Sequence, residues 1–132
     1  MSRIGDFLKE TGVFFLATCD GCRPRLRPLG AFLDKDGKVI FGVGDFKNVY
    51  RQLAANPLCE IAAVKKDGHW LRYTGKAVFE TDPGYAEAML EAMPQLRAIY
   101  NSDTGHKMMC FHLEDAVCVD ICVMGEGEDL LG

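Results

Sequence analysis

Short β-rich segments separated by tight turn signals run through most of this chain, and they limit the folds that it can adopt. The segment Val13–Cys19 ends at Asp20-Gly21, a dipeptide typical of β-hairpin turns. Asp34–Gly37 and Lys66–Gly68 are similar signals, each lying between two apolar segments. Because links this short join antiparallel neighbours, the sequence predicts a sheet built from hairpins.

Strands are expected over most of the chain. Their predicted ranges are Val13–Cys19, Arg23–Leu33, Lys38–Val43, Leu58–Val64, His69–Phe79, Met108–Leu113 and Val117–Met124. The first three are predicted to pair as a meander. A turn at Glu114-Asp115 is predicted to separate the last two.

Few helices interrupt these strands. Phe46, Val49 and Leu53 fall on one apolar helix face, with Asp45 as the expected N-cap and Asn56-Pro57 as the end. Other helices are expected within Met1–Glu10, after Asp82-Pro83 and over Gln95–Tyr100. Many strands with a few peripheral helices predict a mainly β, antiparallel barrel rather than a parallel α/β sheet.

The composition fits a single domain spanning residues 1–132. Of the 132 residues, 48% are hydrophobic and 26% are charged, which is enough to bury a core. The net charge of -4 argues against general nucleic-acid binding, which needs a basic surface. No apolar run is long enough to cross a membrane and no signal peptide is evident, so we expect a cytoplasmic protein. Residues 125–132 are acidic and glycine-broken, and we expect a flexible tail there.

Six cysteines raise the question of a metal site. Cys19 and Cys22 have the spacing of zinc ligands, but a structural site needs a second pair at similar spacing. Cys118 and Cys122 are four residues apart on an expected strand and do not supply it. We therefore expect no metal, and reduced cysteines that act mostly as small buried apolar residues.

The second expected strand has an unusual charge pattern. Arg23, Arg25 and Arg27 alternate, so a regular strand directs all three to one face. Pro24 and Pro28 lack the N–H of a ladder donor, which indicates an edge strand or a bulge. Two interpretations follow: a solvated basic edge that resists aggregation, or a site where an anion relieves the repulsion of the arginines.

A glycine-rich turn leads into the second expected helix. Gly42-Val43-Gly44 lets the backbone approach a ligand closely, and the first turn of the helix offers free N–H groups. Lys47 lies in that turn, where a cation is unfavourable beside the positive end of the helix dipole. A bound phosphate would reverse the sign of this interaction; the alternative is an exposed lysine without a ligand.

Taken in order, these segments resemble a known family. Arg25–Gly30, Lys38–Leu53, Asn56-Pro57 and Trp70–Asp82 together resemble the pyridoxamine 5′-phosphate oxidase-like, FMN-binding split-barrel proteins. The similarity covers Val13–Asp82 well and continues more weakly to Val123. It implies a Greek-key, antiparallel split β-barrel that forms a homodimer, with flavin sites at the subunit interface.

The resemblance also assigns roles by position. It implies that Arg25 or Arg27, together with Lys47, binds the FMN phosphate, with Asn48 as a further polar contact. It places the backbone around Arg27, Pro28 and Leu29 and around Phe41, Gly42 and Val43 along the isoalloxazine ring, and makes Trp70 and Arg72 candidates for contacts near the ring or the dimer seam. A core or interface aromatic is an equally good interpretation of Trp70. The residues do not decide between Arg25 and Arg27, and they name no catalytic acid or base.

The expected function follows from this resemblance. Pyridoxamine phosphate oxidases carry a basic substrate-binding motif near the C-terminus, whereas this chain ends in an acidic segment, so vitamin B6 oxidation is not expected. We expect an FMN-dependent oxidoreductase that passes electrons from a reduced nicotinamide to a small planar acceptor. The alternatives are a non-catalytic FMN carrier or redox sensor, a haem-binding split barrel, or a protein that uses the deazaflavin F420 as its cofactor. Nitroimidazole-resistance-type reductases are among the related short proteins.

Overall fold

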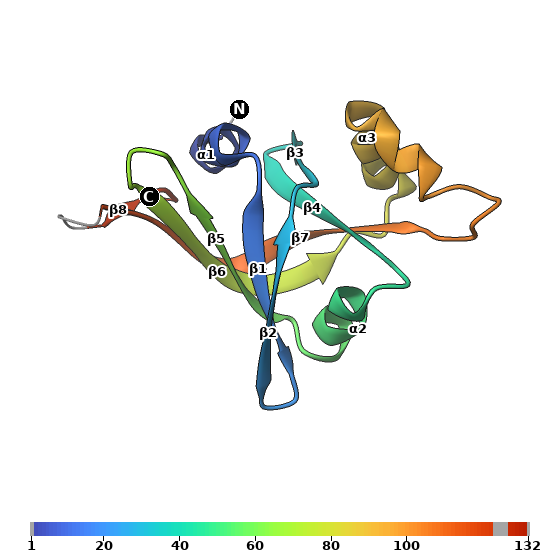
Figure 1. The fold of residues 1–132 in the computed structure, drawn as a ribbon, viewed down its shortest axis with the longest axis horizontal. Helices are drawn as coiled ribbons and strands as arrows, with labels where there is room; N and C mark the ends of the chain where they lie inside the picture. The colour runs from blue at the N-terminus through green and yellow to red at the C-terminus, as the bar shows by residue number, and fades with distance from the viewer. Residues whose placement is uncertain (1, 123–126, 132) are drawn as a thin grey trace.

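The computed structural model describes residues 2–122 and 127–131 of the chain. The elements follow in the order α1 (Arg3–Thr11), β1 (Phe14–Asp20), β2 (Arg23–Leu29), β3 (Phe32–Lys35), β4 (Lys38–Gly44), α2 (Asn48–Ala55), β5 (Leu58–Val64), β6 (Trp70–Phe79), α3 (Pro83–Ala92), the 3₁₀ helix η1 (Pro94–Ala98), β7 (Met108–Ile121) and β8 (Glu128–Asp129). The strands form one antiparallel sheet that curls into a half-barrel with the helices at its periphery (Figure 1). The predicted mainly β, antiparallel fold is confirmed.

The strand order is β2-β1-β5-β6-β7-β4-β3, with β8 paired to β7. The expected strand Arg23–Leu33 is therefore two strands at opposite edges of the sheet, joined by Gly30-Ala31. The predicted meander is wrong, because β2 pairs with β1 while β4 pairs with β3 and β7. A glycine at the junction weakens strand pairing and lets the chain leave one edge for the other. The edge position inferred from Pro24 and Pro28 agrees with the place of β2 in the sheet.

An aromatic core fills the inside of the curled sheet. Phe14, Phe41 and Phe111 are fully buried, with ring centroids 5.5 Å apart for Phe14 and Phe41 and 5.6 Å apart for Phe41 and Phe111. Helix α1 adds Leu8 to this core. A separate cluster, formed by Ile40, Tyr85, Met89, Met108 and Cys110, holds α3 against β4 and β7. These two clusters fix β4 from both of its faces.

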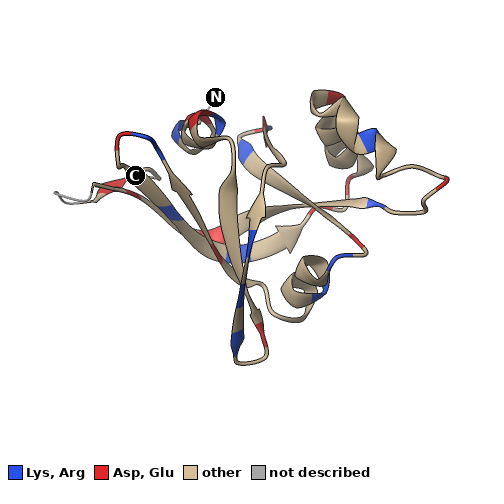
Figure 2. Ribbon diagram, in the orientation of Figure 1, with Lys and Arg blue, Asp and Glu red and all other residues tan. Residues whose placement is uncertain are grey.

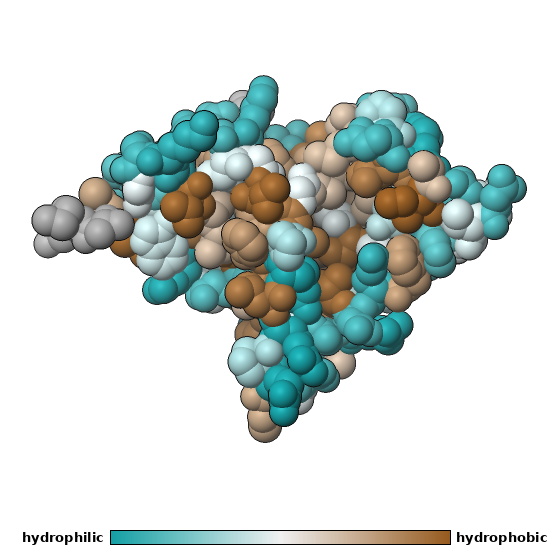
Figure 3. Space-filling model, viewed as in Figure 1, coloured by the Kyte–Doolittle hydropathy of each residue, from teal (hydrophilic) through white to brown (hydrophobic). Residues whose placement is uncertain are grey.

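Apolar side chains also lie on the outer face of the sheet. Phe15, Val64 and Val117 alternate with buried neighbours along their strands and are 42%, 62% and 58% exposed. Figure 3 shows hydrophobic side chains gathered over the middle of one face, where β1 and β5 lie, with hydrophilic residues above and below. We call the set Phe15, Val64, Trp70 and Val117 the outer apolar face.

Strand β7 differs from its prediction. Residues 108–121 form one long strand, so the turn predicted at Glu114-Asp115 is wrong. Thr74 pairs with Val117 and Lys76 with Glu114, which leaves one residue of β6 opposite two of β7. This is a β-bulge, and Asp115 within it has a φ of 50°. The long partner strand β6 holds β7 on both sides of the extra residue.

The predicted N-cap is correct for helix α3 and wrong for helix α2. Asp82 caps α3 as expected, because its carboxylate accepts a hydrogen bond from the N–H of Gly84 at 2.8 Å. Helix α2 instead begins after Lys47, and its N-cap makes no side-chain hydrogen bond. The expected cap, Asp45, accepts the N–H of Lys107 at 3.0 Å. A long-range contact has therefore replaced the local cap.

Part of the segment expected to be a flexible tail forms strand β8 (Glu128–Asp129). Residues 125, 126 and 132 of that segment lie outside the described residues.

The cysteines Cys59, Cys110 and Cys118 are buried, and burial raises their thiol pKa to about 12, 11 and 12 respectively. Within residues 2–122 and 127–131, no three His, Cys, Asp or Glu side chains gather in a way that could hold a metal ion. No helix of the described part has both the length and the apolar composition for a membrane crossing.

Candidate functional site

A hollow of about 500 Å³ lies between β2, the end of β4 and the start of α2. We call it the main hollow. It is lined by Arg25, Leu26, Arg27, Pro28, Leu29, Gly42, Val43, Gly44, Lys47, Asn48, Val49, Gln52 and Tyr100. Strand β3 pairs with β4 only as far as Phe41, so the backbone of Gly42–Gly44 continues beyond that ladder and borders the hollow. The hollow thus occupies the split between the two edges of the sheet.

The main hollow brings together most of the residues assigned to a flavin site from the sequence. Arg25, Arg27, Pro28, Leu29, Gly42, Val43, Lys47 and Asn48 all line it. Phe41 does not, because it is fully buried in the core. Trp70 and Arg72 alternate with buried residues on β6 and lie on the outer side of the sheet, where the Arg72 guanidinium stands 4.8 Å from the Trp70 ring.

Arg27 is fixed by a partly buried hydrogen-bond network. Its Nη1 donates to the hydroxyl of Thr18 at 2.7 Å and to the carbonyl of Leu16 at 3.2 Å, while Nη2 donates to Oε1 of Gln52 at 2.7 Å. The Thr18 hydroxyl in turn donates to the same Gln52 oxygen at 2.6 Å. Thr18 is only 3% exposed. The guanidinium is therefore held in one orientation before any ligand arrives.

The other cations of the hollow are less constrained. Arg25 makes an exposed ion pair with Asp20, with 3.4 Å between Nε and Oδ2. Lys47 stands 5.0 Å from the ring of Phe46 and has no carboxylate partner among the described residues. Among the described residues no acidic side chain lines the main hollow, and the first turn of α2 contains none. The free N–H groups and the positive end of the α2 dipole therefore add to an uncompensated positive charge.

Electrostatics make this arrangement costly without an anion. Burial, and secondarily the charge of Arg25, lower the pKa of Arg27 below its ordinary value. The lowered pKa means that the charged form of Arg27 is disfavoured by its surroundings. The negative charge of an anion among Arg27, Lys47 and the start of α2 would favour the charged form and offset this penalty.

Some residues of the hollow were not foreseen from the sequence. Gln52 lies on the expected helix but carries no local signal, and Thr18 is a polar residue at a core position of an apolar strand, which is the only hint of its role. Tyr100 reaches the hollow from the loop after η1, far along the chain. Burial, and secondarily Asp45, raise the pKa of its phenol.

The histidines lie elsewhere. His112 is in contact with Glu80 through Nδ1 at 2.5 Å and with Glu114 through Nε2 at 2.7 Å. His69 pairs with Asp120 at 2.9 Å. No histidine or cysteine lines the main hollow within the described part of the chain.

Comparisons with known proteins found a matching family model and similar solved structures. The family model described as pyridoxamine 5′-phosphate oxidase matches residues 2–115. A NimC/NimA family protein from Clostridium acetobutylicum is 34% identical, with a TM-score of 0.88 over 97% of this chain and 89% of that one. A comparison with curated proteins found no match.

More distant structures share the split-barrel fold. A FAD-binding protein from Mesorhizobium loti has a TM-score of 0.63 and 13% identity over 92% of this chain and 96% of its own. A haem-binding protein from Mycobacterium smegmatis has a TM-score of 0.71 and 20% identity over 93% of this chain and 54% of its own. The half-barrel described above is therefore a split barrel of this kind.

Proposed function

Since the chain belongs to the pyridoxamine 5′-phosphate oxidase family, we propose that it is an FMN-binding oxidoreductase that passes electrons from a reduced nicotinamide to a small planar acceptor. The observation that carries the proposal is the main hollow, which Arg27, Lys47 and the start of α2 line together and where no carboxylate of residues 2–122 and 127–131 is found. No other described hollow combines these features with the glycine-rich end of β4.

The phosphate of FMN fits one end of the main hollow. Its negative charge needs guanidinium and backbone donors, and both are present. Arg27 still has its Nε–H and one Nη2 hydrogen without a partner among the described residues. Lys47 supplies a second cation, and the start of α2, which no side chain caps, supplies N–H groups. Asn48 lies beside them as a further polar contact.

The flavin ring fits the other end. The backbone of Gly42–Gly44 forms one wall there, and a side chain at Gly44 would stand 2.9 Å from the Tyr100 hydroxyl and 2.7 Å from the Phe46 ring. Leu29 and Val43 offer apolar surface, and Tyr100 offers a phenol donor. A bound flavin supplies the redox chemistry, while these residues orient it and exclude water.

Two alternatives have less support. A haem group prefers an axial histidine or cysteine, and neither lines the main hollow within the described residues. A non-catalytic carrier or sensor would use the same flavin site, and reduction by a nicotinamide separates it from an enzyme.

We also propose that the functional unit is a homodimer. The outer apolar face is the surface that a second copy would cover, since large contiguous exposed apolar patches on soluble proteins commonly mark interaction sites. Trp70 and Arg72 lie on that face, which favours a role at the dimer seam.

A first experiment tests the cofactor class. We expect the protein purified without added cofactor to show the visible absorption bands of flavin, and NADH or NADPH to bleach them anaerobically. A Soret band in their place would exclude the flavin proposal. Flavin bands that no nicotinamide bleaches would favour the carrier or sensor.

A second experiment tests the phosphate site. Lys47→Ala and Arg27→Ala should each weaken FMN binding about 10- to 100-fold in calorimetric titrations, since each removes a charged hydrogen bond of roughly 1.5–3 kcal/mol. Riboflavin, which lacks the phosphate, should bind these variants about as well as wild type. Lys66→Ala removes an exposed lysine remote from the main hollow and serves as the control. Equal losses for FMN and riboflavin would show that neither side chain contacts the phosphate.

A further inference from the structure

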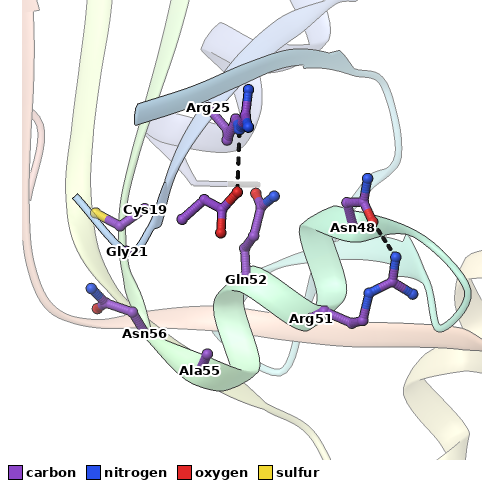
Figure 4. A pocket seen from close by; sticks show the side chains of 9 residues that line it. Cys19, Gly21, Arg25, Asn48, Arg51, Gln52, Ala55 and Asn56 are labelled. Carbon is purple, nitrogen blue, oxygen red and sulfur yellow. Dashed lines mark hydrogen bonds and ion pairs between the residues drawn. The ribbon is translucent and has the colours of Figure 1, made fainter. Parts of the chain in front are cut away.

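A second hollow continues from the phosphate end of the main hollow. It measures about 430 Å³ and shares Arg25, Asn48 and Gln52 with it. We call it the polar hollow. It is lined by Cys19, Asp20, Gly21, Arg25, Asn48, Arg51, Gln52, Ala55 and Asn56 (Figure 4). Its size lies within the range of small-molecule pockets, roughly 300–1,000 Å³.

The polar hollow lies between two arginines on different elements. Figure 4 shows Arg25 on β2 above the hollow, with Gln52 of α2 extending toward it and Arg51 one helix position away. Arg51 donates from Nη2 to the amide oxygen of Asn48 and has no carboxylate partner among the described residues. Within the part of the chain that the structure describes, Asp20 is the one acidic residue of the lining, and it pairs with Arg25.

Positive charge continues beyond this hollow along β2. The ladder with β1 places Arg23, Arg25 and Arg27 opposite Asp20, Thr18 and Leu16, and therefore on one face of the strand. Arg23 and Arg25 line a third, shallow hollow at the hairpin. Lys and Arg positions run along β2 and lie at the neighbouring start of α2 in Figure 2. The set Arg23, Arg25, Arg27, Lys47 and Arg51 forms a cationic track that extends past the phosphate of a mononucleotide.

We infer that the polar hollow binds a second anionic group beyond the flavin phosphate, so that this site prefers FAD to FMN. The inference rests on the proposed function, because it starts from a flavin in the main hollow. Arg27, Lys47 and α2 satisfy the first phosphate, which leaves Arg25 and Arg51 to bind the second phosphate of a dinucleotide. The adenosine then lies toward the amides of the polar hollow.

Charge explains why an anion fits here better than a neutral group. Two arginines and one carboxylate line the polar hollow among the described residues, and the neighbouring Arg27 and Lys47 add further positive charge. Guanidinium forks bind diphosphates through paired, charge-assisted hydrogen bonds. The other interpretation of the arginines, a solvated basic edge strand, explains Arg23 on β2. It does not explain Arg51 of α2, which lines the polar hollow together with Arg25.

The test compares three ligands on cofactor-free protein by isothermal titration calorimetry: riboflavin, FMN and FAD. Wild type should bind FAD at least about tenfold more tightly than FMN, the gain expected of one additional charge-assisted contact. Arg51→Ala should reduce FAD affinity about tenfold and leave FMN affinity within about twofold. Asp20→Asn should act in the opposite direction, strengthening FAD alone. Arg97→Ala, which removes an exposed arginine paired with Glu87, is the matched control.

The outcomes separate this inference from the proposed function. If FMN binds but FAD binds no better, the inference is overturned and the flavin site stands. If Arg51→Ala weakens FMN and FAD equally, Arg51 contacts the first phosphate and the inference is overturned as well. If no flavin binds at all, the proposed function fails first. Should Arg51→Ala misfold, the wild-type ratio of the two affinities and the Asp20→Asn variant still decide.

Discussion

At the scale of single residues, the best-defined feature of the main hollow is the way Arg27 is held. The sequence indicated a phosphate-binding arginine on the second strand, but Arg25 and Arg27 had equal claims. Their surroundings differ: Thr18 and Gln52 orient Arg27 inside the split, whereas Arg25 pairs with Asp20 at the surface. Periodicity places both arginines on one face and says nothing about their partners. The partners come from β1 and α2, and only the fold brings these together.

Thr18→Val tests whether this orientation matters for binding. The valine keeps the shape of threonine but removes the hydroxyl that accepts from Arg27 and donates to Gln52. We expect a loss of about 1–2 kcal/mol in the free energy of unfolding and a several-fold weaker affinity for FMN. Riboflavin affinity should change little. Urea unfolding and calorimetric titration measure the two effects, and an unchanged FMN affinity would mean that the hydroxyl does not position Arg27.

At the scale of elements, local sequence patterns predicted the bounds of a strand or helix correctly where its own residues determine where it begins and ends. Leu58–Val64 has the predicted bounds, and α3 begins at its predicted cap. The failures lie where distant partners decide. Asp45 accepts a hydrogen bond from the N–H of Lys107 instead of capping α2. The expected strand Arg23–Leu33 is divided at Gly30-Ala31 between two edges of the sheet. Strand β7 pairs with β6 on both sides of the position where a turn was expected. Of the residues that line the main hollow, Arg25, Arg27 and Lys47 were named from the sequence, whereas Gln52 and Tyr100 were not.

Gly75→Ala tests the importance of the β6–β7 bulge. A Cβ at Gly75 would stand 3.0 Å from the carbonyl oxygen of Glu114, 3.1 Å from Leu113 Cβ and 3.2 Å from Ala116 Cβ. Because these are backbone-fixed atoms, the strands must shift, and we expect about 1–3 kcal/mol of destabilisation. Gly30→Ala, whose Cβ meets nothing within 4 Å, is the control and should cost less than about 0.5 kcal/mol. The fluorescence of the single tryptophan during urea unfolding reports both, and equal stabilities would contradict the close packing seen at the bulge.

At the scale of the whole molecule, the two sides of the split barrel have different surfaces. One side carries the main hollow and the cationic track, and the other carries the outer apolar face. The residues that the sequence assigned to one site are divided between these sides, with Trp70 and Arg72 on the second. A homodimer would reunite them, because a partner's outer surface could complete a site that one subunit leaves open.

Val64→Lys tests that assembly. Val64 is 62% exposed on the outer apolar face, and a buried lysine there would oppose dimer formation. We expect wild type to elute from size exclusion with light scattering at twice the chain mass of 14.6 kDa, and the variant at the chain mass. Flavin affinity should fall with the dimer. Ile99→Lys, at an exposed apolar position away from that face, should remain dimeric. A wild-type monomer would overturn the proposed assembly.

The strand order also sets when a cofactor can first bind. Strand β2 pairs with β1 soon after both are synthesised, but β4 is held on one side by β7, and α2, β5, β6, α3 and η1 are made in between. Tyr100 likewise follows most of the chain. Sheets with such distant pairings form slowly compared with helical bundles. On the ribosome, the two walls of the main hollow therefore meet only after nearly the whole chain has emerged, and flavin loading becomes a step that follows synthesis.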